Sequence, residues 1–331
     1  MNVTVKPQIG IIAGGNSSEF VVSIKSGQNL WEAIDHGKFT PWLIHIREEE
    51  WQVVEQGIPV APVDKADFSF VRNGEKIRID YDYITIHGTP GEDGILQGYF
   101  DMLKIPYSTC DVQASALTFN KWYCNNYLRN FGIPMARTIR LTKGEYFNPA
   151  EIVATLGLPL FVKPNAGGSS FGVTKVKKEE ELAGALFHAW NESKEALVDE
   201  FIPGKEYTCG LVRTKGELLT FPVTEVVPKN EFFDFEAKYT PGVTDEITPA
   251  RLPEELFRKC QELSRKIYTL CGCSGIVRMD YILHDNTFYF LEVNTTPGMT
   301  STSFIPQQIK AMGKTLTEIL TMVIGEKLKT G

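Results

Sequence analysis

The sequence lacks the features that mark several large classes of protein. No window approaches the ~18 consecutive apolar residues of a membrane-spanning helix. The N-terminal stretch MNVTVKPQIGIIAGG lacks a basic region followed by an apolar stretch and a cleavage site, so we expect no signal peptide. A formal net charge of −7 argues against general binding to nucleic acid or to a membrane surface, although it does not exclude a small anionic ligand.

Metal and redox signatures are also missing. The five histidines are well separated and none forms an H-E-x-x-H pair. The six cysteines are scattered, and Cys271 and Cys273 are spaced C-x-C rather than C-x-x-C. We therefore expect no structural zinc, and reduced thiols in a cytoplasmic protein.

What the sequence does contain indicates more than one domain, because 331 residues exceed what a single hydrophobic core usually supports. The first third alternates strands and helices. The expected strands are 9–13, 42–46 and 83–88, and the expected helices are 23–35 and 95–104. This rhythm predicts an N-terminal α/β domain over residues 1–110 with a parallel, Rossmann-like sheet.

The remaining chain reads as two α+β units, over residues 111–202 and 203–331. The first contains an expected single long helix at 116–131, shorter helices at 149–156 and 179–190, and strands between them. The second contains a hairpin around TKGE, a helix at 253–271, another hairpin around HDN and two terminal helices. The polar segment 229–251 has no clear period, and a loop of this length is usually functional or disordered.

The stretch FYFLEVNTTPGMTS (288–301) places two oxygen-bearing side chains in an apolar run. Glu292 and Asn294 are two residues apart and should point to the same face of a strand. Asp280, on the preceding strand, can join them if the hairpin register places it opposite. An all-oxygen set of this kind suits Mg²⁺ or Mn²⁺, which usually share their remaining ligands with water and phosphate. The spacing alone is also compatible with a solvated sheet face that carries ordinary acids.

The segment FVKPNAGGSSFGVTK (161–175) is rich in glycine and serine. It is not a P-loop, because Val173 stands where the lysine is needed and a strand-like pattern follows instead of a helix. A turn between two strands could offer N–H groups and hydroxyls to phosphate oxygens, with a charge supplied by Lys163. The alternative is a plain flexible hairpin.

Eight segments together resemble the ATP-grasp superfamily and, within it, the D-alanine–D-alanine ligase family, over nearly the whole chain. They are 13–27, 87–98, 119–122, 161–176, 199–208, 233–239, 277–281 and 291–306. The resemblance implies an ATP-grasp fold of three domains, with ATP between the sheets of the central and C-terminal units. It implies a reaction in which ATP phosphorylates one D-alanine and the amine of a second D-alanine displaces the phosphate. It also implies a homodimer.

The resemblance further implies a role for each matching residue. For the substrates, Glu19 would hold the ammonium of the first D-alanine, and Ser169 and Tyr239 would form hydrogen bonds with Glu19. Arg278 and the Gly298 N–H would stabilise the negative charge that develops in the reaction. Ser303 would bind the carboxylate of the second D-alanine, and His87 would lie near the substrates. For ATP, the implied residues are Lys121, Lys163, Ser170 and Lys238 at the phosphates, Glu200, Phe201 and Ile202 at adenine, and Glu206 at the ribose. Asp280, Glu292 and Asn294 would hold two Mg²⁺ or Mn²⁺ ions, and 229–251 would be a lid.

The sequence departs from the family pattern at Gly167, where many relatives have a polar residue, and at Asp199, where glutamate is common. Three other functions remain open. One is a ligase that joins D-alanine to D-lactate or D-serine, although Tyr239 resembles the dipeptide-forming type. The others are an ATP-grasp carboxylate–amine ligase with different substrates, and a non-catalytic nucleotide-binding protein.

Overall fold

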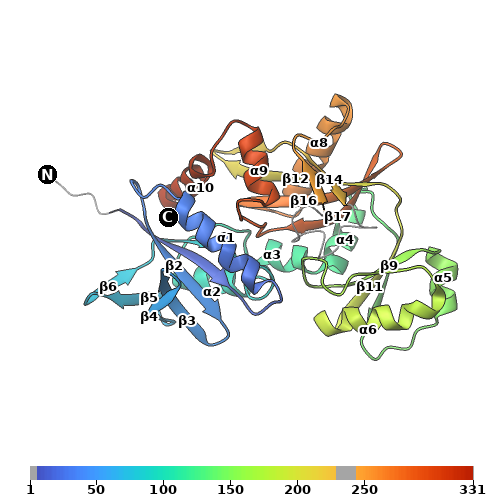
Figure 1. Ribbon diagram of the computed structural model, residues 1–331, viewed down its shortest axis with the longest axis horizontal. Helices are drawn as coiled ribbons and strands as arrows, with labels where there is room; N and C mark the ends of the chain where they lie inside the picture. The colour runs from blue at the N-terminus through green and yellow to red at the C-terminus, as the bar shows by residue number, and fades with distance from the viewer. Residues whose placement is uncertain (1–5, 229–243, 331) are drawn as a thin grey trace.

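The computed structural model describes residues 6–228 and 244–330, which form three β-sheets with helices packed around them (Figure 1). Within those residues, no helix combines the length and the apolar character that crossing a membrane requires. The three sheets follow one another along the chain, with helices packed between and around them.

The N-terminal sheet has seven strands in the order β6-β5-β4-β3-β2-β1-β7. They are β1 (Gln8–Gly14), β2 (Thr40–Arg47), β3 (Glu50–Glu55), β4 (Ile58–Asp64), β5 (Ser69–Arg72), β6 (Glu75–Arg78) and β7 (Tyr81–Ile84). β1 pairs in parallel with β2 and β7, as the βαβ pattern predicts. The sheet is mixed rather than wholly parallel, however, because β2 to β6 are joined by antiparallel pairing.

Two of the four connections in the antiparallel half are tight turns with positive φ at both of their residues. Gln56 and Gly57 connect β3 to β4 with φ values of 50° and 79°, and Asn73 and Gly74 connect β5 to β6 with φ values of 52° and 81°. Two-residue turns with positive φ at both positions match the twist of antiparallel strands. Asn73-Gly74 is a hairpin signal that the purely parallel interpretation overlooked.

Helix α1 (Phe20–Ala33) begins three residues earlier than the sequence predicts and packs closely against β1, while α2 (Ile95–Leu103) matches its expected range. A Cβ added to Gly27 would lie 2.8 Å from the Cβ of Ala13, so only glycine permits this approach. The buried Ser23 hydroxyl accepts a hydrogen bond from the Gly14 N–H at 2.8 Å and fixes the helix on the strand. Glu19, directly before α1, is thereby held at the end of β1.

The expected helix over 116–131 is two helices, α3 (Val112–Phe119) and α4 (Lys121–Arg129). Asn120 separates them in an extended conformation, and its side chain accepts a hydrogen bond from the Tyr123 N–H at 3.0 Å. Asparagine favours such caps because its side chain competes with the helical backbone bonds. The break makes Lys121 the first residue of α4.

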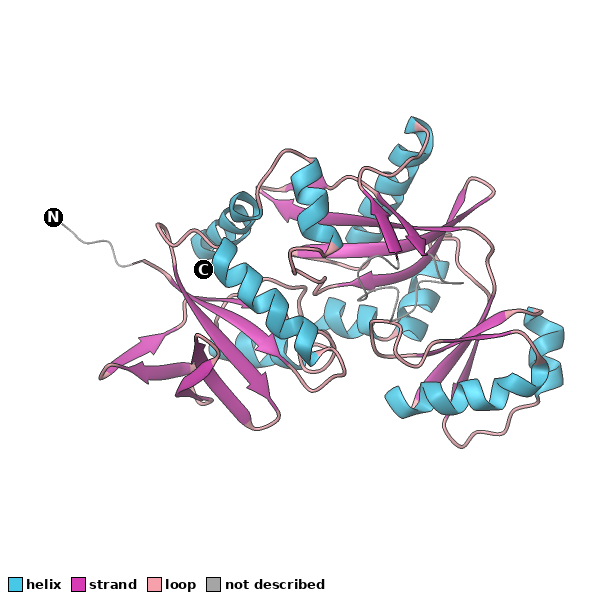
Figure 2. Cartoon of the chain, viewed as in Figure 1, coloured by secondary structure: helices cyan, strands magenta, loops and turns pink. Residues whose placement is uncertain are grey.

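The central sheet is antiparallel, with the order β10-β9-β11-β8. Its strands are β8 (Thr138–Thr142), β9 (Leu160–Pro164), β10 (Thr174–Val176) and β11 (Glu195–Glu200), and its helices are α5 (Pro149–Leu156) and α6 (Leu182–Glu192), shown in Figure 2. Residues 179–181, expected as part of the second helix, form a 3-10 turn before α6. The glycine-rich segment connects β9 to β10, as predicted.

The third sheet has the order β15-β14-β12-β16-β17, and β13 pairs with β12. Its strands are β12 (Lys205–Thr214), β13 (Glu217–Thr220), β14 (Thr224–Pro228), β15 (Thr244–Ile247), β16 (Ile276–His284) and β17 (Thr287–Asn294). Both predicted hairpins, β12–β13 and β16–β17, are confirmed. The expectation of a loop throughout 229–251 is wrong at β15, which pairs with β14. The helices are α8 (Glu254–Leu270), α9 (Phe304–Ala311) and α10 (Leu316–Thr330).

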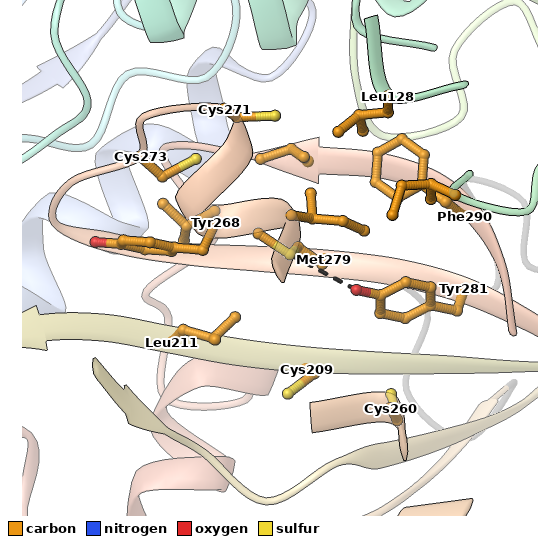
Figure 3. Packing of buried hydrophobic residues seen from close by; sticks show 14 of the residues in the cluster. Leu128, Cys209, Leu211, Cys260, Tyr268, Cys271, Cys273, Met279, Tyr281 and Phe290 are labelled. Atoms are coloured by element: carbon orange, nitrogen blue, oxygen red, sulfur yellow. Dashed lines mark hydrogen bonds between the residues drawn. The ribbon is translucent and has the colours of Figure 1, made fainter. Parts of the chain in front are cut away.

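Two hydrophobic cores position the site. All six cysteines are buried free thiols in one core, which also contains residues of β12, β16 and β17. Figure 3 labels four of these cysteines and marks the hydrogen bond that the Tyr281 hydroxyl donates to the Met279 sulfur, which has a length of 3.6 Å. A second core joins the two ends of the chain, because Ile11 and Leu30 pack in the same cluster as Ile305 and Ile319. This shared core brings the start of α1 close to the start of α9.

Candidate active site

Two adjoining cavities lie where the three sheets meet. The first is lined mainly by the central and C-terminal sheets, and the second reaches the starts of α1 and α9. Ser169, Glu206, Asp280 and Glu292 line both cavities. Any group transferred between a ligand in one cavity and a ligand in the other would pass these four side chains.

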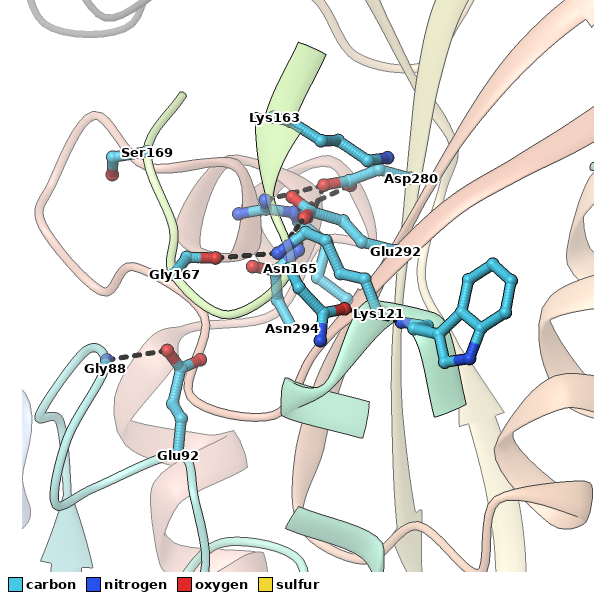
Figure 4. A network of polar contacts seen from close by, with 12 residues as sticks. Gly88, Glu92, Lys121, Lys163, Asn165, Gly167, Ser169, Asp280, Glu292 and Asn294 are labelled. Carbon is cyan, nitrogen blue, oxygen red and sulfur yellow. Dashed lines mark hydrogen bonds and ion pairs between the residues drawn. The ribbon is translucent and has the colours of Figure 1, made fainter. Parts of the chain in front are cut away.

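The hairpin register brings the three expected metal ligands together. Asp280 lies opposite Glu292, and Asn294 lies opposite Arg278, with a register shift directly after Asp280. The Asn294 amide donates to Asp280 Oδ2 at 3.0 Å, and Lys121 Nζ lies 3.3 Å from Glu292 Oε2 (Figure 4). The three side chains offer oxygen ligands on one face of the hairpin, which fits the preference of Mg²⁺ and Mn²⁺.

Arg278 is tied to the same cluster. Its Nε and Nη2 donate to Asp280 Oδ1 and Oδ2 at 2.9 and 2.8 Å, and Thr208 donates to Oδ1 at 2.6 Å. Arg278 also lies over the ring of Phe304, with 5.3 Å between the guanidinium carbon and the ring centroid. The planar guanidinium group of Arg278, held in this way, presents a positive charge in a fixed position to the second cavity.

Two lysines border the first cavity. Lys121 Nζ donates to the carbonyl of Gly167 at 2.7 Å, so it links α4 to the glycine-rich turn. Lys163 Nζ lies 2.8 Å from Asp199 Oδ2. Burial opposes the charge on Lys163, but the Asp199 carboxylate outweighs burial and raises the pKa of Lys163. Lys163 is therefore a permanent cation beside the cavity.

The glycine-rich turn has a backbone suited to close contact with a ligand. Gly167 has a φ of 136°, a conformation that side chains rarely adopt, while Ser169 and Ser170 have φ values of 48° and 60°. Both serines line the first cavity. The absence of a polar side chain at Gly167 thus reflects a conformational need of this turn.

The segment expected at adenine borders the first cavity only in part. Glu200, Ile202 and Glu206 line it, whereas Phe201 packs beside Phe161, with 6.1 Å between ring centroids. The carboxylate of Glu200 also accepts a hydrogen bond from the Arg137 N–H at 2.8 Å. The side chain of Glu200 is therefore already engaged by Arg137, and the backbone groups of this segment are the ligands that we expect it to offer.

The second cavity contains the expected substrate residues. Glu19 is buried, with 7% exposure, and accepts a hydrogen bond from the Ser169 hydroxyl. Gly298 and Ser303 lie together, since a Cβ on Gly298 would be 3.0 Å from Ser303 Oγ. Ser303 occupies the N-cap position of α9, but its hydroxyl makes no capping bond to the helix and instead accepts from the Thr300 N–H at 3.1 Å. Lys238 and Tyr239 lie outside the described residues.

Sequence reasoning missed several residues that shape the site. Asn165 is 1% exposed; its carbonyl accepts from the Lys121 N–H at 3.1 Å, and its side chain from the Trp122 N–H at 2.8 Å. Glu92 accepts from the Gly88 N–H at 2.7 Å, and burial raises its pKa, an effect that His87 partly offsets. Both residues lie within segments that resemble the family, but their contacts depend on distant parts of the chain.

Comparison with known proteins indicates the family of this chain. The family model "D-ala D-ala ligase N-terminus" matches residues 8–110, and "D-ala D-ala ligase C-terminus" matches residues 127–325. A D-alanine–D-alanine ligase of Phocaeicola vulgatus is 50% identical over 324 residues, which cover 98% of this chain and 100% of the relative. The chain belongs to the D-alanine–D-alanine ligase family.

Solved structures of this family share the fold, which is the ATP-grasp fold. D-alanyl-alanine synthetase A from Vibrio cholerae superposes with a TM-score of 0.88 at 26% identity, covering 99% of this chain and 100% of that one. The VanG D-Ala:D-Ser ligase from Enterococcus faecalis has a TM-score of 0.85 at 33% identity, covering 98% and 100%. A ligase from Bacillus anthracis complexed with ATP has a TM-score of 0.78 at 31% identity, covering 98% of both chains.

Proposed function

We propose that this protein is an ATP-dependent ligase that joins two D-alanines through a D-alanyl phosphate, giving D-alanyl-D-alanine for peptidoglycan precursors. One observation carries the proposal. Ser169, Glu206, Asp280 and Glu292 line both the cavity bordered by Lys121 and Lys163 and the cavity that contains Glu19 and Ser303. The first cavity offers cations to phosphates and the second offers groups to an amino acid, so a phosphoryl group can pass between them.

In the first cavity the proposed ligand is ATP. Lys121, Lys163 and Ser170 would contact its phosphates, the backbone of 200–202 its adenine, and Glu206 its ribose. Asp280, Glu292 and Asn294 would hold two Mg²⁺ or Mn²⁺ ions, which, when bound, neutralise charge on the phosphates. Lys163 stays protonated through the neutral range because Asp199 raises its pKa, so it offers its charge to phosphate at any working pH.

In the second cavity the proposed ligands are the two D-alanines. Glu19 would hold the ammonium of the first, whose carboxylate attacks the γ-phosphorus while ADP leaves. The second D-alanine loses a proton from its ammonium, and the resulting amine attacks the carbonyl carbon of the acyl phosphate. Inorganic phosphate leaves with the C–O bond electrons, and the nitrogen gives up one further proton as the amide forms. Arg278 and the Gly298 N–H would stabilise the negative charge that develops on oxygen, because both are fixed before the reaction begins.

Three sheets, over residues 8–84, 138–200 and 205–294, support three domains, for which we propose the divisions 1–110, 111–202 and 203–331. We also propose a homodimer, from the family resemblance, and a cytoplasmic location, where ATP is available. Light scattering of the purified protein tests the dimer. A mass equal to one chain at micromolar concentration would contradict it.

A second D-alanine is favoured over D-lactate or D-serine as the final substrate. The support is that relatives about 50% identical over nearly the whole chain are named D-alanine–D-alanine ligases. The test measures phosphate release from ATP with D-alanine, L-alanine, D-serine, or D-alanine plus D-lactate, and identifies products by mass spectrometry. We expect D-alanine alone to support rapid release and to yield the dipeptide. Equal release with L-alanine, or a mixed product in excess of the dipeptide, would contradict the proposal.

A further inference from the structure

The second cavity is rich in carboxylates, and one of them has no task in the reaction described above. The described residues that line it include five acids, Glu19, Glu206, Glu246, Asp280 and Glu292, and one cation of the lysine or arginine type, Arg278. The proposed function assigns the first ammonium to Glu19, the ribose to Glu206, and metal ions to Asp280 and Glu292. Glu246 is the acid that remains.

Glu246 is fixed in place from the side of α9. The amide of Gln307 donates to the Glu246 carboxylate and also to the Thr302 carbonyl, the latter at 2.7 Å. Gln307 lies one helical turn after Ser303, the N-cap of α9. The carboxylate of Glu246 is therefore held near the end of α9 where Ser303 is proposed to bind the carboxylate of the second D-alanine.

The direction of the side chain follows from the strand. Glu246 lies opposite Val226 in the β14–β15 pair, and successive residues of a strand point to opposite faces. Asp245, its neighbour, is exposed, whereas Glu246 is half-buried and lines the cavity. The two adjacent acids thus differ in their surroundings, although they belong to the same short strand.

The charge of Glu246 is only partly compensated by the described residues. Burial raises its pKa, while the Gln307 amide and the Arg278 guanidinium act in the opposite direction. Arg278 already donates to both oxygens of Asp280. Glu246 thus adds negative charge on the α9 side of the cavity, so an ammonium group placed beside it would be favoured.

A second observation indicates that a ligand belongs here. His87 is 6% exposed and lines the same cavity, and its Nε2 atom has no hydrogen-bond partner among the described residues. A buried polar atom without a partner is costly, and one that faces a cavity can find its partner in a ligand. The cavity therefore has room for a polar ligand group that forms a hydrogen bond with His87.

We infer that Glu246 binds the ammonium group of the incoming second D-alanine, which gives up a proton before its amine attacks, and this inference rests on the proposed ligase function. With Ser303 at the carboxylate, the zwitterion would extend from the start of α9 to β15. D-Lactate has a hydroxyl in place of the ammonium and gains nothing from Glu246. Glu246 is thus a specificity-determining residue that favours an amine over a hydroxy acid as the second substrate.

The test compares wild type, Glu246→Gln and Asp245→Asn. Asp245→Asn removes the same charge one residue away from an exposed position. The KM for the second D-alanine is obtained from the D-alanine dependence of dipeptide formation. Hydroxylamine, a small neutral nucleophile, separately traps D-alanyl phosphate as the hydroxamate and reports the first half-reaction. Thermal unfolding checks that each variant is folded.

We expect Glu246→Gln to raise the KM for the second D-alanine by roughly ten- to a hundred-fold, the range for loss of a hydrogen bond between charged groups. The rate of hydroxamate formation by Glu246→Gln should stay within about two-fold of the wild-type rate, because the first half-reaction does not use this carboxylate. Asp245→Asn should behave as wild type in both assays. An unchanged KM in Glu246→Gln, or an equal loss of dipeptide and hydroxamate, would overturn the inference. Wild-type protein that makes neither product would instead contradict the ligase function itself.

If Glu246→Gln does not fold, Gln307→Leu provides the second variant, because it removes the amide that fixes the carboxylate. It should raise the KM for the second D-alanine in the same direction and leave hydroxamate formation unchanged. A Gln307→Leu protein with the wild-type KM would then count against the inference.

Discussion

The Ser169 hydroxyl donates a hydrogen bond to the Glu19 carboxylate, although 150 residues separate the two in the chain. The bond connects the glycine-rich turn of the central sheet to the start of α1 in the N-terminal part. Gly168 shares this contact, because a Cβ there would lie 2.4 Å from Glu19 Oε2. The carboxylate proposed to hold the first D-alanine is therefore positioned by the turn proposed to contact ATP.

Replacing Ser169 with alanine should weaken D-alanine binding more than ATP binding. A hydrogen bond to a charged group contributes about 1.5 to 3 kcal/mol, so we expect the KM for the first D-alanine to rise at least roughly ten-fold. Ser170→Ala is the comparison, since Ser170 lines only the first cavity and should act on the KM for ATP. Steady-state kinetics with each substrate varied in turn measure both values. Equal changes in the two constants for Ser169→Ala would contradict the prediction.

Replacing Glu292 with glutamine should lower kcat strongly and change the free energy of unfolding much less. The change removes one negative charge from the oxygen cluster and leaves Lys121, now 3.3 Å away, without that partner. Loss of metal-assisted charge stabilisation is worth several kcal/mol, so kcat should fall by roughly a hundred-fold or more. The measurement is kcat at saturating ATP and D-alanine over a range of Mg²⁺ concentrations.

Glu217→Gln is the matched control for that experiment. Glu217 is an exposed acid in the β12–β13 hairpin, so its removal changes net charge equally without touching the cluster. We expect this variant to keep wild-type kcat. Near-normal turnover of Glu292→Gln at every Mg²⁺ concentration would show that the cluster does not serve the metal ions.

The site could be predicted from the sequence where its residues are close in the chain. The alternation in 276–294 and the short HDN turn together determine the hairpin, and the hairpin register then places Asp280 opposite Glu292. In the same way, the strand pattern on each side of the glycines identified the turn between β9 and β10. Local periodicity and turn chemistry are sufficient for such features.

Contacts between distant segments could not be predicted in this way. Lys163 lies opposite Leu197 in the β9–β11 pair, and its ion-pair partner Asp199 is two residues further along the strand. That pair depends on a strand register that no local signal specifies. The position of Glu246 in the site was not predicted for a similar reason, because β15 is short and polar and is stabilised by pairing with β14. Asn120 broke a helix that apolar periodicity alone predicted to be continuous.

The Lys163–Asp199 pair predicts a large effect on stability. The side chains are 15% and 11% exposed, and Asp199 also accepts from the Thr138 hydroxyl at 2.7 Å. Asp199→Asn leaves a buried ammonium without its nearest counter-charge, so the free energy of unfolding should fall by about 3 kcal/mol. Urea denaturation measures this, with Asp285→Asn as control, since the Asp285 side chain is 89% exposed. A decrease in the free energy of unfolding as small as that of the control would show that water stabilises the charge on Lys163 when Asp199 is replaced.

Glu225 predicts a specific dependence of stability on pH. Its side chain is fully buried and lies between Arg251 and Lys205, with oxygen–nitrogen distances of 2.8 and 3.1 Å. The Arg251 guanidinium outweighs burial and, with the Lys205 ammonium, holds the pKa of Glu225 below its ordinary value of 4.5. A carboxyl whose pKa is lowered by folding stabilises the native state above its unfolded pKa, and this contribution is lost as pH falls through the folded pKa.

The free energy of unfolding of wild type should therefore exceed that of Glu225→Gln at neutral pH. The difference should stay constant down to about pH 5, close to the unfolded pKa, and then shrink as the acid protonates. Urea denaturation of both proteins across this pH range measures the difference. The control is Glu217→Gln, in which an exposed acid is replaced, and its curve of unfolding free energy against pH should have the same shape as that of wild type. Curves for wild type and Glu225→Gln that stay parallel into the acid range would mean that Arg251 and Lys205 do not act on Glu225 as the distances indicate.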